Sequence, residues 1–76
     1  MSTQQQIDME ASVDHHPSGR LTLKERAVGT LMWTDVADQG LRGILDHVAF
    51  YRQVARRLAD HARDGTRVVS YKDNLH

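Results

Sequence analysis

Hydrophobic residues recur at helical spacing in two stretches of the chain, and the first stretch predicts a short helix. Thr22 precedes Glu25 by three residues, which is the spacing of a capping box at the start of a helix. Apolar positions at helical spacing then follow, namely Leu23, Ala27, Val28, Leu31 and Met32. This pattern predicts a helix over residues 22–33.

The second stretch keeps a single hydrophobic phase from residue 35 to residue 64. Counted in sevens, it has two apolar rows: Ala37, Ile44, Tyr51 and Leu58 in one, and Leu41, Val48, Ala55 and Ala62 in the other. Asp35 is a good N-cap and Gly65 a good C-cap. We therefore predict a long helix over 35–64 with a seam of the coiled-coil or bundle type, either continuous or hinged at Gly40 and Gly43.

The two ends of the chain have a different composition. Residues 1–19 are rich in Gln, Ser, Asp and His and close on the turn signal Pro17-Ser18-Gly19, so we expect a disordered tail. Residues 66–71 have β character, but a single short strand needs a partner. We expect residues 66–76 to form an extended tail that pairs only in an oligomer or complex.

These patterns together predict an all-α protein. Its helical domain spans residues 20–65, between the disordered tail 1–19 and the extended tail 66–76. The apolar arc of the long helix is too wide for one short helix to cover, so we expect self-association or docking on a partner to complete a helical bundle. The chain has no cysteine, so no disulfide can compensate for a small core.

Charge and hydropathy limit the possible surroundings. Ten basic and ten acidic residues give a formal net charge of zero, so no overall field attracts the chain to nucleic acid or an anionic membrane. No stretch approaches the roughly 20 apolar residues of a membrane span, and the Gln-rich start lacks the features of a signal peptide. We expect a cytoplasmic protein that does not bind membranes.

The sequence contains no motif typical of catalysis. It has no Gly-rich phosphate loop, Ser-centred elbow or HExxH motif, and the absence of Cys excludes a thiol nucleophile. His47 and His61 share a side of the predicted helix but would lie about 21 Å apart at 1.5 Å per residue, too far to chelate one metal ion. We expect no enzymatic activity, no cofactor and no metal.

The most informative side chains lie on or beside the long predicted helix. Phe50 points away from the heptad seam, next to Arg57 and near His61 on the helical wheel. It either packs under the first helix or the tail, or belongs to a partner-binding patch, since aromatic residues and Arg are enriched in binding hot spots. The expected partner-binding residues are Ile44, Val48, Phe50, Tyr51, Arg52, Arg56, Arg57 and Arg63. We predict a non-enzymatic interaction module, regulator or inhibitor that acts through an amphipathic helical surface, with itself as a homodimer or with a larger protein as partner.

Two alternatives remain open. A dimer could bind nucleic acid through an arginine face formed by Arg42, Arg52, Arg56 and Arg63, and its binding would then weaken steeply with salt. The chain could also be an accessory subunit of an enzyme, in which case it would co-purify with a much larger protein.

Overall fold

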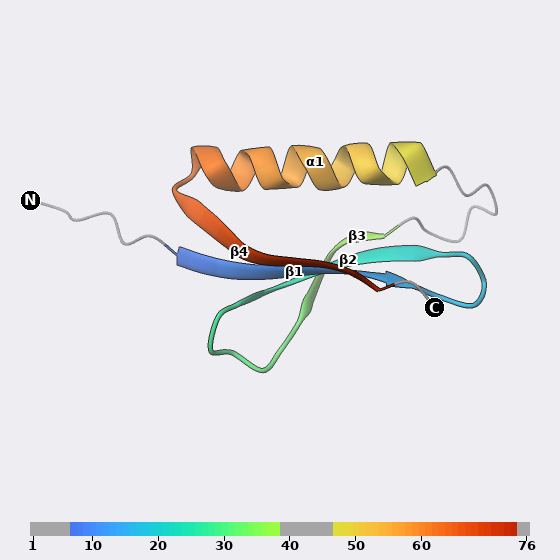
Figure 1. The fold of residues 1–76 in the computed structure, drawn as a ribbon, viewed down its shortest axis with the longest axis horizontal. Helices are drawn as coiled ribbons and strands as arrows, with labels where there is room; N and C mark the ends of the chain where they lie inside the picture. The colour runs from blue at the N-terminus through green and yellow to red at the C-terminus, as the bar shows by residue number, and fades with distance from the viewer. Residues whose placement is uncertain (1–6, 39–46, 75–76) are drawn as a thin grey trace, which may run out of the picture.

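The computed structural model describes residues 7–38 and 47–74, and in this part of the chain one helix covers one face of a four-stranded sheet (Figure 1). The elements in chain order are β1 (Ile7–His15), β2 (Leu21–Ala27), β3 (Thr34–Asp38), α1 (His47–Arg63) and β4 (Thr66–Asn74).

The sheet is mixed, with the strand order β3-β2-β1-β4. β2 pairs antiparallel with both β1 and β3, whereas β4 pairs parallel with β1. A parallel pair requires a crossover connection, and α1 lies in the connection that leads to β4. The first and last described strands are therefore neighbours (Figure 1).

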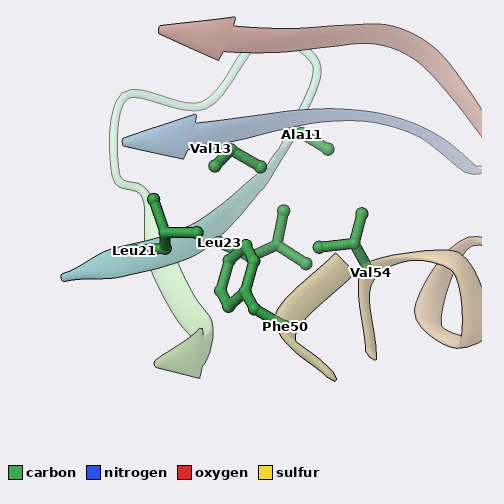
Figure 2. Close-up of a cluster of buried hydrophobic side chains, with 6 residues drawn as sticks. All are labelled: Ala11, Val13, Leu21, Leu23, Phe50 and Val54. Atoms are coloured by element: carbon green, nitrogen blue, oxygen red, sulfur yellow. The ribbon is translucent and has the colours of Figure 1, made fainter. Parts of the chain in front are cut away.

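The core lies between α1 and the sheet and consists mainly of alternate strand residues. Successive strand side chains point to opposite faces, so one row of each strand is directed at the helix. The buried apolar side chains of the described residues are Ala11, Val13, Leu21, Leu23, Phe50 and Val54 (Figure 2). The first four come from β1 and β2, and the last two come from the inner side of α1.

Two local predictions are confirmed, the turn at Pro17-Ser18-Gly19 and the helix C-cap at Gly65. Pro17-Ser18-Gly19 turns β1 into β2, with Gly19 donating to the carbonyl of His16 at 2.8 Å and adopting a φ of 89°. Gly65 follows the end of α1 with a φ of 78°, as expected of a C-cap glycine. Both glycines lie in the left-handed region, which other residues rarely adopt.

The all-α prediction is wrong, and the first predicted helix is a strand followed by a loop. Residues 21–27 form β2, in which Thr22 and Glu25 lie on opposite faces, so they do not form a capping box. Leu21, Leu23 and Glu25 alternate with polar residues along the strand. This period-two pattern is inconspicuous in the sequence because its third inward residue is charged.

The long predicted helix is correct only in part. Residues 47–63 form α1, but residues 34–38 form β3, and residues 39–46, with the proposed hinge, lie outside the described residues. The coiled-coil and helical-bundle predictions are wrong because Phe50, Val54 and Leu58 pack against the chain's own sheet. Helical periodicity shows that one face of a helix is buried, but not whether a helix or a sheet covers it.

The prediction of a disordered N-terminal tail is wrong for the described residues, whereas residues 66–74 are extended as predicted but pair within the chain and not only in an oligomer. Residues 7–15 form β1, a central strand, and residues 66–74 form β4, which pairs with β1 of the same chain. The signal for β1 was the alternation of Met9, Ala11 and Val13 with polar residues.

In the described part of the chain, α1 is too short and too polar to cross a membrane.

Candidate protein-interaction site

The connection between β2 and β3, residues 28–33, places large apolar side chains in solvent, and we call it the β2–β3 loop. Leu31 is 90% exposed, Met32 82%, Val28 52% and Trp33 38%. The loop extends from the side of the sheet opposite α1 (Figure 1). Scattered exposed apolar residues are ordinary, but larger contiguous apolar patches often mark interaction sites, so the β2–β3 loop is a candidate contact surface.

Local hydrogen bonds give the β2–β3 loop a defined shape. The Thr30 amide and hydroxyl both donate to the carbonyl of Ala27, at 3.0 and 2.7 Å. Gly29, the third residue of this four-residue turn, has a φ of 92°, as in type II turns. The Val28 amide donates to the carbonyl of Asp8 at 3.0 Å and so ties the start of the loop to β1.

Trp33 is held at the other end of the loop by Arg26. The Arg26 guanidinium lies 4.5 Å from the centroid of the Trp33 ring, which is a cation–π geometry. Arg26 Nε also donates to Glu10 Oε2 at 2.6 Å. The aromatic ring is thereby connected through β2 to β1, which restricts its orientation.

An open hollow of about 430 Å³ lies at the base of the loop. Its apolar lining consists of Met9, Ala27, Met32 and Val36. Glu25 and Arg57 add an ion pair to the lining. The rest of the lining is polar, namely Arg26, Thr30 and Thr34, and the exposed Met32 belongs to both the loop and the hollow.

Glu25 is the centre of a charged cluster that joins β2 to α1. Its carboxylate is almost completely buried and accepts hydrogen bonds from Arg57 Nε and Nη2, both at 3.0 Å, while His61 Nε2 lies 2.9 Å away. Burial alone would raise the pKa of Glu25, but the bonds from Arg57 and His61 outweigh it and lower the pKa. Glu25 therefore stays ionised and fixes α1 on the sheet.

The sheet face opposite α1 carries matched charges. Cross-strand ion pairs join Lys24 to Asp14 at 2.6 Å, Arg26 to Glu10 at 2.6 Å, Arg20 to Asp38 at 2.7 Å and Arg67 to Asp8 at 3.1 Å. The acidic and basic groups lie on neighbouring strands, so their fields largely cancel. This face has no excess of positive charge to attract a polyanion.

A second polar cluster joins β1, α1 and β4. Asp73 lies 2.5 Å from His15 Nε2 and accepts a hydrogen bond of 2.5 Å from the Tyr51 hydroxyl. Burial, and then the Asp73 carboxylate, raise the pKa of Tyr51 to about 12. A tyrosine that stays protonated and bonded in this way is suited to fixing the helix on the strands, and not to transferring a proton near neutral pH. Within residues 7–38 and 47–74, no three His, Asp or Glu side chains are grouped so as to hold a metal ion.

The predicted partner-binding residues lie in different environments. Phe50 belongs to the core, Tyr51 to the cluster with Asp73, and Arg57 to the cluster with Glu25. Val48, Arg52, Arg56 and Arg63 are exposed on α1, with Arg63 paired to Asp60. Ile44 and Arg42 lie outside the described residues.

The sequence interpretation did not identify the β2–β3 loop as a candidate surface. It assigned Leu31 and Met32 to the buried side of a helix, because their spacing from Leu23 and Val28 is helical. The available signal was Gly29-Thr30 directly after the alternating strand, a typical place for a turn.

Comparisons with models of protein families, with curated proteins and with solved structures found no match.

Proposed function

We propose that the protein is a non-enzymatic protein–protein interaction module whose contact surface is the β2–β3 loop with the hollow at its base. The observation that carries this proposal is the exposure of Leu31 and Met32, at 90% and 82%, within a loop of defined shape. Burying such a side chain in an interface is favourable by about 1.5–3 kcal/mol, so the two together provide a substantial driving force.

The structure of the loop supports this role in a second way. Binding costs less when the contact residues are already ordered, and Thr30, Gly29 and the Trp33–Arg26 contact order this loop. Trp and Arg are also the residue types most enriched in binding hot spots. The site therefore combines apolar area, aromatic character and preorganisation.

The proposed surface differs from the one expected from the sequence. The apolar side of α1 packs on the sheet, so its inner residues Phe50 and Val54 are already covered. Arg52 and Arg56 remain exposed on the outer side and support the alternative of nucleic-acid binding. The balanced charges of the sheet and the zero net charge of the chain favour a protein partner.

Photo-crosslinking from single positions tests the proposal in the native host. A benzophenone amino acid at position 31 should form protein adducts, whereas the same group at Gln53, exposed on α1, should not. Excess wild-type protein should compete for the adduct, and a Leu31→Ser/Met32→Ser variant should not. Equal adducts at both positions, or none at position 31, would contradict a protein-binding role for the loop.

A further inference from the structure

We infer that the partner of the β2–β3 loop is a second copy of this chain, in a symmetric dimer in which the loop of each copy fills the hollow of the other. This inference rests on the proposed function, because it names the partner for the same surface.

The first argument is the position of the loop beside the hollow. Met32 projects into solvent and also lines the hollow, next to Ala27 and Val36. A two-fold axis between a protrusion and an adjacent cavity places each protrusion in the cavity of the other copy, which closes the assembly at two subunits. Each contact then places apolar loop side chains against Met9, Ala27 and Val36, in a hollow that also has polar lining residues.

The second argument is the charge of the surface. Near a two-fold axis a charged group faces its own copy, so an unpaired charge there would oppose association. Around the loop, Arg26 is paired with Glu10, and in the hollow Arg57 is paired with Glu25. The zero net charge of the whole chain adds no long-range repulsion between copies.

The third argument is the small core. Six apolar side chains are buried in the described part of the chain, and a domain of this size buries only about 60% of the surface exposed by the unfolded chain. Small proteins that lack disulfides often gain stability by oligomerisation, and this chain has no cysteine. Burial of Leu31 and Met32 in a dimer would supply the missing apolar contacts.

The edges of the sheet are less suited to self-association than the loop. β4 carries a bulge at Val69 and a lysine at position 72, and both features disfavour pairing with another strand. β3 is only five residues long and includes Asp35 and Asp38. These features direct association away from strand pairing and towards the loop.

Light scattering over a wide concentration range provides the first test. We expect twice the chain mass for the wild type and for Val48→Ser, which alters an exposed apolar residue on α1, and the single-chain mass for Leu31→Ser/Met32→Ser. A monomeric wild type would overturn the inference. So would a loop variant that stays dimeric.

Cysteine pairs test the exchange geometry, since the natural chain has no cysteine to interfere. Under mild oxidation, a mixture of Met32→Cys and Ala27→Cys proteins should form the mixed disulfide several-fold faster than either protein forms its own. Faster crosslinking of the Met32→Cys protein with itself would indicate loops that meet each other, and it would overturn the proposed placement of each loop in the other copy's hollow.

If the wild type is monomeric but position 31 still forms adducts heavier than two chains, the proposed function stands with another protein as partner. Loss of adducts as well would remove both proposals.

Discussion

At the residue scale, Glu25 shows how one buried charge can be accommodated in a small core. Its side chain is 2% exposed and lies in the inward row of β2, after Leu21 and Leu23. An isolated carboxylate would be very costly there, and the ion pair with Arg57 and the hydrogen bond with His61 offset that cost. Because Arg57 remains partly exposed, solvent screens part of the interaction.

The lowered pKa of Glu25 predicts how stability depends on pH. The Glu25 carboxylate should contribute fully above its ordinary pKa of 4.5, and this contribution should be lost as the pH falls through the lower pKa of the folded state. We expect the free energy of unfolding, measured by urea titration followed by circular dichroism, to decrease as the pH is lowered below 4.5. Asp14, whose pKa is lowered by the bond from Lys24, should act in the same direction.

A double variant provides the control for this prediction. Glu25→Leu/Arg57→Met replaces the ion pair by apolar groups and should be within about 2 kcal/mol of the wild type at neutral pH, because such exchanges are often neutral or stabilising. Its stability should fall less steeply in acid. An acid profile identical to that of the wild type would show that Glu25 does not contribute to the pH dependence.

At the scale of elements, the same residue pattern can serve more than one structure. The apolar side of α1 was predicted from its periodicity, but the sheet that covers it was not, since its strands come from both ends of the sequence. The spacing of Leu23, Val28 and Leu31 suits a helix, although the chain uses Leu23 in a strand and the other two in a loop. Short-range spacing does not distinguish these cases, because contacts with other elements decide between them.

The contact between Arg26 and Trp33 should determine the order of the β2–β3 loop. Arg26→Met removes both the cation–π contact and the ion pair with Glu10, so Trp33 should become more mobile. We expect lower fluorescence anisotropy from this single tryptophan and a loss of stability of about 0.5–1 kcal/mol. Arg20→Met, which breaks the ion pair with Asp38 at the opposite end of β2, should leave the anisotropy unchanged. Equal changes in the two variants would contradict a specific role for Arg26.

At the scale of the whole molecule, β4 completes the sheet by pairing with β1, the strand farthest from it in sequence. Val68 of β4 packs against the core, whereas its neighbour Val69 occupies the bulge and is about half exposed. The cluster of His15, Tyr51 and Asp73 adds a polar connection between the two strands and α1. Folding therefore requires contact between the first and last described elements.

Neighbouring substitutions in β4 can test this closure. Val68→Asp places a charge against the core and should lower the free energy of unfolding by about 1–3 kcal/mol. Val69→Asp adds the same charge at an exposed position and should change stability by no more than about 0.5 kcal/mol. Thermal unfolding followed by circular dichroism measures both effects. A larger loss for Val69→Asp would contradict the packing of β4 described above.

The sequence by itself determined those features that depend on near neighbours or on composition. Gly65 marked the end of α1, and Pro17-Ser18-Gly19 marked a turn. The periodicity of residues 35–64 predicted an amphipathic helix, which the structure shows over residues 47–63, because backbone preference and helical spacing act over a few residues. Only the tertiary structure decided that residues 7–15 and 66–74 are paired strands, that Glu25 is buried, and that Leu31 and Met32 are exposed. The reason is physical: strand pairing and burial depend on residues distant in sequence, and the helical spacing and the Thr22–Glu25 motif had a local interpretation that those distant contacts overrode.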